Sequence, residues 1–156
     1  MSKKITLKSL QDNYRDRKLF EVIKGCKLLL KKDTNLLECE MLLASALLET
    51  GQPLESIEIF LGILKKYSQV PSNVYYNLSS AYKNTYNHKD ALFYARQYVN
   101  MNPKNLMGFL RLGELYTTLS LSGERRMSYF MAASIDPNNQ IALRGLSESF
   151  RTESDS

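Results

Sequence analysis

Side chains suited to binding a peptide gather in two stretches of this sequence, with one arginine further on. Asparagine amides both donate and accept hydrogen bonds, and an arginine can hold a carboxylate through two parallel hydrogen bonds. A plain solvated helix face is the simpler interpretation of any one of these residues. As a set they are our candidate partner-binding residues: Tyr76, Asn77, Ser80, Lys83, Asn84, Met107, Leu110, Arg111, Glu114 and Arg144.

Residues that could perform catalysis form no recognisable motif. His88 is the only histidine and falls in a predicted turn, and the 7 glycines are scattered. No phosphate-binding loop, metalloprotease motif or nucleophile elbow occurs. Cys26 and Cys39 lie within helical patterns and are interpreted as small buried hydrophobes. We therefore expect no catalytic residues, no metal ligands, no cofactor and no enzyme activity.

The elements that would carry the candidate residues are predicted most clearly over residues 72–105. Two apolar runs with the i, i+3, i+4, i+7 spacing of an amphipathic helix flank a polar turn at 86–90. Asn102 and Pro103 end the second run, because proline cannot continue a helix. The apolar positions are Tyr75, Leu78, Ala81 and Tyr82 in the first run, and Ala91, Tyr94, Ala95, Tyr98 and Val99 in the second.

The same pattern recurs 34 residues later, which predicts an array of helical repeats. Matching positions are Tyr75, Leu78, Ser79, Tyr82, Ala91 and Pro103 in one unit and Phe109, Leu112, Gly113, Tyr116, Ala132 and Pro137 in the next. This pattern resembles the tetratricopeptide repeat. The resemblance implies an all-α, right-handed superhelical stack of antiparallel helix hairpins with a C-terminal capping helix. Its small positions let helices approach closely, and its first helices line a concave groove.

We predict a single repeat domain over residues 1–150. It comprises a divergent hairpin at 3–36, repeats at 37–71, 72–105 and 106–139, a capping helix at 140–150 and a flexible tail at 151–156. Gly51 should end one helix and Pro53 should start the next. Arg125 stands where the pattern has alanine, so the helix predicted at 123–134 should start late or expose its first turn. In the capping helix, Leu143, Leu146, Ser147 and Phe150 match the first-helix pattern.

Positive charge is concentrated at the start of the chain. The whole chain has a net charge of +5, but residues 1–32 alone carry +7. Such asymmetry is typical either of contact with an acidic partner, a nucleic acid or an anionic surface, or of the polar outer face of a terminal repeat. No nucleic-acid motif accompanies the charge. No apolar run reaches the ~20 residues of a membrane span, and no secretory signal is present, so we expect a cytoplasmic protein.

The function that these observations predict is a protein-interaction module, an adaptor or scaffold that binds a partner peptide or helix in its groove. Some members of the resembling family bind chaperone C-termini through a clamp of two lysines, two asparagines and an arginine. Its positions fall here on Met41, Ser45, Asn77, Met107 and Arg111, so both lysines and one asparagine are missing and that clamp is not expected. Two alternatives remain: an N-terminal regulatory or substrate-docking domain of a larger enzyme such as a transferase, and binding of nucleic acid or an anionic surface through the basic hairpin.

Overall fold

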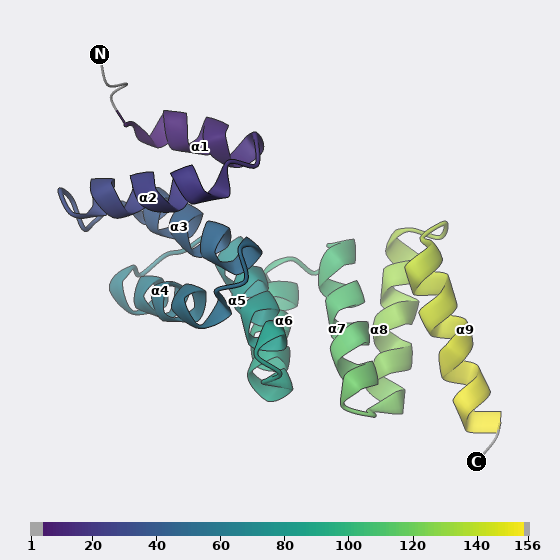
Figure 1. Cartoon of the computed structure of the whole chain (residues 1–156). Coiled ribbons are helices and arrows are strands. Elements are labelled where there is room, and N and C mark those ends of the chain that lie inside the picture. Colours follow the sequence, from purple (N-terminus) through teal and green to yellow (C-terminus); the bar gives the residue numbers. More distant parts are fainter. Residues whose placement is uncertain (1–4, 155–156) are drawn as a thin grey trace. The chain divides into compact units, whose positions relative to one another are not determined.

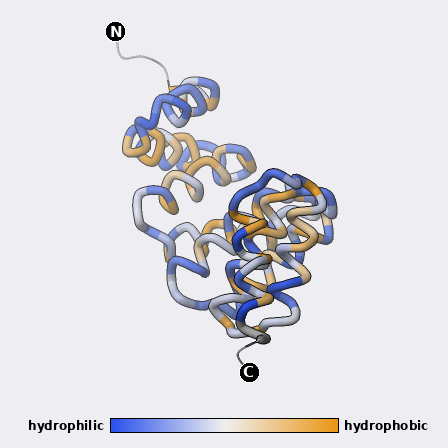
Figure 2. The backbone as a smooth tube through the Cα atoms, turned by 90° about the vertical axis from the view of Figure 1, so that its right-hand side faces the viewer, coloured by the Kyte–Doolittle hydropathy of each residue, from blue (hydrophilic) through white to orange (hydrophobic). Residues whose placement is uncertain are grey.

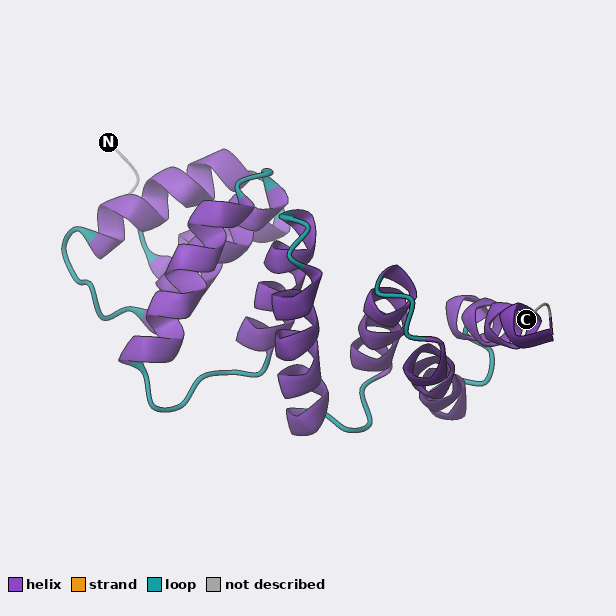
Figure 3. Cartoon of the chain, turned by 90° about the horizontal axis from the view of Figure 1, so that it is seen from below, coloured by secondary structure: helices purple, strands orange, loops and turns teal. Residues whose placement is uncertain are grey.

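Helices make up the regular structure in the part of the chain that is described. The structure, a computed structural model, describes residues 5–154, and over that range nine helices follow one another without a strand (Figures 1 and 3). The first four and last two residues, which include the start of the predicted hairpin and the end of the predicted tail, lie outside that range. The predicted all-α fold of antiparallel helices is confirmed. The chain divides into two compact units, Met1–Thr85 and Tyr86–Ser156.

The first unit holds five helices, and each packs against the next. They are α1 (Leu7–Arg15), α2 (Leu19–Leu30), α3 (Leu37–Glu49), α4 (Pro53–Lys66) and α5 (Asn73–Asn84). Hydrophobic and hydrophilic residues alternate along them, which gives each helix an apolar stripe to bury (Figure 2). A core cluster joins α1, α2 and α3 through Leu10, Leu19, Val22, Cys26, Cys39, Leu43, Ala46 and Leu47.

The second unit holds four helices, which also pack in sequence. They are α6 (His88–Met101), α7 (Leu106–Thr118), α8 (Ser122–Ile135) and α9 (Gln140–Ser154). Leu110, Tyr129, Ala132 and Ala142 form a core cluster of α7, α8 and α9. Tyr129 is packed so closely against both Gly113 and Gly145 that a Cβ on either glycine would lie under 3 Å from its ring. Gly113 therefore serves as the small position that the sequence predicted.

A residue with left-handed backbone recurs in the turn after four of the helices. The φ angles are 60° at Arg17, 80° at Gly51, 59° at Tyr86 and 57° at Ser120. Their spacing of 34 or 35 residues repeats the period of the sequence. This conformation ends a helix and satisfies its last carbonyls, and glycine adopts it most easily. The predictions that Gly51 ends α3 and that Pro53 opens α4 are confirmed.

Of the two alternatives expected for α8, the exposed first turn is observed: the helix begins at Ser122, and residues 122–124 are exposed. One helix boundary differs from the expectation. Helix α9 continues beyond residue 150 as far as Ser154, into the segment that was expected to be a tail. Within the described part of the chain, none of the helices combines the length and the apolar character that crossing a membrane requires.

Candidate functional site

Five of the ten candidate residues lie on one side of α5 in the first unit. Tyr76, Asn77, Ser80 and Lys83 are half-buried and Asn84 is exposed. Their spacing places them on one face of the helix. They are thus brought together as predicted.

The amide of Asn77 is held in place by the neighbouring helix. Its Nδ2 donates a hydrogen bond of 3.2 Å to Oγ of Ser45 on α3. The Ser80 hydroxyl donates to the carbonyl of Tyr76 at 3.1 Å, one turn back along α5. An amide fixed through one of its N–H groups still has a carbonyl oxygen and a second N–H with which to bind a peptide backbone.

The other five candidates lie in the second unit, on α7 and α9. Met107 is 51% exposed at the start of α7. The side chain of Arg111 is 12% exposed, and its Nε lies 3.6 Å from the carboxylate of Glu114, which is 48% exposed. Arg144 on α9 is exposed and lies 3.9 Å from Glu148. The Arg144–Glu148 pair is exposed on both sides, and such pairs contribute little to stability, so its groups can exchange partners at small cost.

Leu110 does not face a groove, which corrects the prediction. It is 9% exposed and belongs to the core cluster of the second unit. Tyr129 and Ala132 on α8 and Ala142 on α9 close over it. The sequence pattern placed Leu110 outside the packing positions of its helix, but α8 and α9 bury it.

The five positions of the chaperone-binding clamp offer a single positive charge. Met41 and Ser45 on α3 and Asn77 on α5 are half-buried and uncharged, and Met107 on α7 is exposed and uncharged. Arg111 is the cation among them, and it already has Glu114 beside it.

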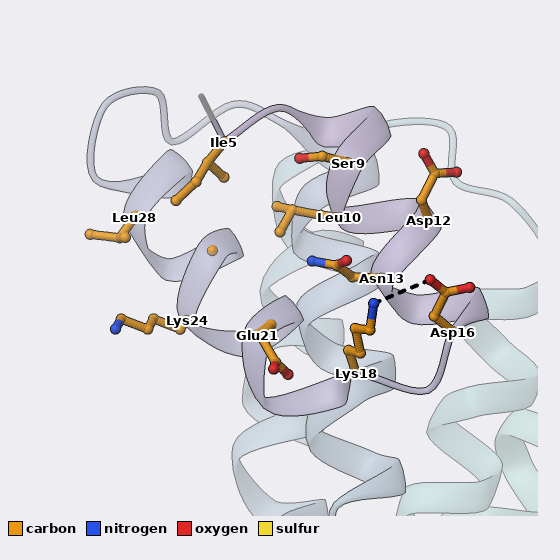
Figure 4. A pocket seen from close by; sticks show the side chains of 11 residues that line it. Ile5, Ser9, Leu10, Asp12, Asn13, Asp16, Lys18, Glu21, Lys24 and Leu28 are labelled. Atoms are coloured by element: carbon orange, nitrogen blue, oxygen red, sulfur yellow. Dashed lines mark hydrogen bonds and ion pairs between the residues drawn. The ribbon is translucent and has the colours of Figure 1, made fainter. Parts of the chain in front are cut away.

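The basic N-terminal hairpin carries a hollow between α1 and α2 with a volume of about 590 Å³. Figure 4 shows its mixed lining: Ile5, Leu10 and Leu28 supply apolar surface, and charged side chains of both signs surround them. The charged residues are Asp12, Asp16, Lys18, Glu21 and Lys24. Because three of these five are acidic, the hollow itself does not favour an anion.

Several cations of this hairpin are paired within the unit. Lys18 Nζ lies 3.4 Å from Asp16, and Lys27 Nζ lies 2.8 Å from Glu55 on α4. Arg17 and Tyr14 both bind the carboxylate of Glu49 at the end of α3. Burial, followed by the hydrogen bond to Glu49, raises the pKa of the Tyr14 phenol. This polar contact between α1 and α3 was not predicted from sequence, because nothing local connects residues so far apart.

The described residues contain no cluster of three or more His, Cys, Asp or Glu side chains that could hold a metal ion. Cys26 and Cys39 are free and buried, as predicted, and burial raises the pKa of both thiols. A raised thiol pKa disfavours the thiolate, which is the nucleophilic form.

Comparison with known proteins begins at the level of sequence. No protein-family profile matches the chain. Heat shock protein STI1 of Saccharomyces cerevisiae is 32% identical over 100 residues, which are 64% of this chain and 17% of STI1. The chain therefore spans about a sixth of the length of that curated relative.

Solved structures resemble the chain more extensively. MamA from Desulfovibrio magneticus RS-1 superposes with a TM-score of 0.86 at 18% identity, over 95% of this chain and 83% of MamA. YrrB, a TPR protein with an unusual peptide-binding site, gives 0.81 at 13% identity, over 93% and 74%. The second TPR domain of human RPAP3, solved with the HSP70 peptide SGPTIEEVD, gives 0.62 at 18% identity, over 68% and 88%. The chain thus has the fold of these tetratricopeptide-repeat structures.

Proposed function

We propose that this chain is a protein-interaction module that binds a peptide or helix of a partner protein on the polar faces of its first helices. The observation that carries the proposal is the side of α5 on which Tyr76, Asn77, Ser80, Lys83 and Asn84 lie together. No catalytic role belongs to the proposal. We place the protein in the cytoplasm, since the free thiols of Cys26 and Cys39 suit a reducing compartment.

The α5 face has the chemistry that backbone recognition requires. Asn77 is oriented by Ser45 before a ligand arrives, which reduces the entropy lost on binding. Tyr76 adds a flat amphipathic surface with few rotatable bonds, and Lys83 adds a positive charge at the other end of the face. An extended segment could hydrogen-bond to the amide while its side chains pack beside the tyrosine ring.

Known proteins of the same fold support this assignment. YrrB has a peptide-binding site, and the RPAP3 domain was solved with a bound HSP70 peptide. The clamp positions of the present chain argue for a different peptide, because Met41 and Met107 stand where the clamp has lysines. We therefore expect the peptide SGPTIEEVD to bind far more weakly to this chain than to the RPAP3 domain. Comparable affinities, measured side by side by calorimetry, would show that a chaperone tail is the ligand after all.

The decisive experiment compares partner capture by wild type and by the double variant Tyr76→Ala/Arg111→Ala. The matched control is Tyr86→Ala/Arg15→Ala, because Tyr86 is 84% exposed in a turn and the Arg15 side chain is 73% exposed on α1. Each protein is used to capture partners from a lysate of the source cell, with nuclease-treated and high-salt samples alongside, and the binding segment of a captured protein is then synthesised.

The proposal predicts that the control variant binds this segment like wild type and that the double variant loses at least about tenfold in affinity, or 1.4 kcal/mol. Circular dichroism verifies that both variants remain folded. Equal affinity of the double variant and wild type would refute the site. Capture that survives the double substitution but vanishes with nuclease or salt would move the function to the basic hairpin, because counterion release makes nucleic-acid binding strongly salt-dependent.

A further inference from the structure

One side of α2 combines positive charge with exposed apolar side chains. Its residues recur at the i, i+4, i+7, i+8, i+11 spacing, which places them within about 100° of arc on a helix. They are Phe20, Lys24, Lys27, Leu28 and Lys31, and we call them the outer face of α2. Phe20 is 75% exposed, Leu28 is 41% exposed, and the three lysines are exposed as well.

Folding of the first unit relies on the opposite side of α2. That side packs against α1 and α3, and its Val22 and Cys26 are fully buried in the core cluster of the unit. Figure 4 shows the side chains of Lys24 and Leu28 extending in the same direction from α2. The packing of the unit therefore gives no reason for a large apolar side chain at Phe20, in the middle of exposed lysines.

The positive charge of the outer face is balanced only in part by its surroundings. Lys27 pairs with Glu55 of α4 at 2.8 Å, but the two side chains are 49% and 41% exposed, so the pair can be given up at small cost. Lys24 and Lys31 form no ion pair with a described residue. Glu21 is the acidic residue of α2, and its position in the sequence places it at the edge of the face. The outer face thus presents an excess of positive charge.

We propose that the outer face of α2 binds the surface of a membrane that contains anionic lipids. Such a surface attracts clustered basic side chains, and each lysine close to it strengthens partitioning about fivefold. The long lysine stems let the ammonium groups stay among the lipid headgroups while Phe20 and Leu28 reach the boundary of the acyl chains. Charge and apolar area thus act together, since both lie on the same side of one helix.

The type of cation favours a lipid surface over other acidic partners. The cations of the outer face are lysines, which are compact point charges, whereas the planar fork of arginine suits a fixed pair of acceptors. Protein–protein interfaces are enriched in arginine and depleted in lysine. The two arginines of this hairpin, Arg15 and Arg17, are paired within the unit with Asp12 and Glu49. A nucleic acid would engage the lysines through its phosphates but would give Leu28 no role.

The first test is co-sedimentation of the 156-residue chain with two kinds of vesicle, phosphatidylcholine alone and phosphatidylcholine with about 30% phosphatidylserine. We expect binding to the second kind only, and weaker binding as salt is added. The variant Lys24→Glu/Lys31→Glu should lower the partition coefficient at least about 25-fold, because two lysines are lost. The control Lys89→Glu/Lys104→Glu makes the same change in net charge at exposed residues of the second unit and should bind like wild type. Circular dichroism verifies that both variants are folded.

Contact of Phe20 with the lipid can be followed by fluorescence, because the chain contains no tryptophan. The emission of the Phe20→Trp variant should shift to the blue when vesicles with phosphatidylserine are added, since the indole leaves water. Phe93→Trp replaces a phenylalanine that is 54% exposed on α6 of the second unit, and its emission should not shift. Glu21→Gln should strengthen partitioning about fivefold, because it removes an acidic group at the edge of the outer face.

Several results would overturn the proposal. Equal partitioning onto both kinds of vesicle, or onto neither, would exclude a site for anionic lipid. Equal losses in Lys24→Glu/Lys31→Glu and in its control would reduce the effect to net charge. An unshifted emission of Phe20→Trp on bound vesicles would place the contact elsewhere on the chain. Displacement from the vesicles by an oligonucleotide or by polyglutamate at lower concentration than the lipid would assign the face to a nucleic acid or an acidic protein. None of these variants alters the α5 face, so the outcome is independent of the proposed peptide site.

Discussion

Tyr129 is packed against glycines of two neighbouring helices, and replacing one of these by alanine tests how closely the helices must approach. A Cβ on Gly145 would lie 2.6 Å from three ring atoms of Tyr129, and one on Gly113 would lie 2.7 Å from two atoms of the same ring. Ordinary carbon contacts are about 3.5–4.0 Å, so Gly145→Ala creates an overlap of about 1 Å. Either the ring or α9 has to move.

The expected cost follows from two opposing effects. Overpacking of a core by one methyl group destabilises by about 1–3 kcal/mol. Alanine favours the helix over glycine by about 1 kcal/mol, which offsets part of that loss. Tyr129 is only 9% exposed and is confined by glycines of both α7 and α9, so it has little room to retreat. We therefore expect Gly145→Ala to lower the free energy of unfolding by about 1–2 kcal/mol.

The matched control is Gly123→Ala in the first turn of α8, where a new Cβ would meet no atom within 4 Å. This variant should be neutral or gain up to about 1 kcal/mol. A second comparison places Gly145→Ala in a Tyr129→Leu background. In that background Gly145→Ala should raise the free energy of unfolding, because alanine still favours the helix over glycine and its Cβ no longer overlaps an aromatic ring.

The assay is urea denaturation followed by circular dichroism, combined with amide hydrogen exchange to show which helices lose stability. Exchange should accelerate in α8 and α9 of Gly145→Ala and remain unchanged in the first unit. Stabilisation of the wild-type background by Gly145→Ala would refute the reasoning, because it would mean that the ring yields at no cost. An equal penalty with and without the tyrosine ring would place the conflict at some other contact.

Three other properties can be tested directly. Gly51→Ala should destabilise by about 1 kcal/mol because of its φ of 80°, whereas Gly62→Ala, in the exposed middle of α4, should stabilise by about 1 kcal/mol, and thermal denaturation compares the two. Because burial raises the pKa of Tyr14 above its ordinary value of 10.0, the folded chain should lose stability as pH rises through about 10, and Tyr14→Phe should reduce that loss in a pH series of urea midpoints. Cys26 and Cys39 should react with a thiol reagent at pH 8 only as the chain unfolds, so rapid labelling of the native protein would contradict their burial.

The role of a repeat position could be predicted from sequence where that role requires a particular type of residue. Gly113 was assigned as a small position, and it does admit Tyr129. Gly51 was assigned as a helix end, and it has the left-handed backbone expected there. The same backbone conformation at Arg17 and Ser120 was missed, because those residues do not prefer it and only the hairpin geometry imposes it.

The candidate site could be predicted only in part, since helical periodicity fixes which residues share a face but not what covers that face. It grouped Tyr76, Asn77 and Lys83 correctly on α5. It misplaced Leu110, whose burial depends on the later helices α8 and α9. The hydrogen bond from Tyr14 to Glu49 depends in the same way on how distant segments pack, and no local sequence pattern predicts it.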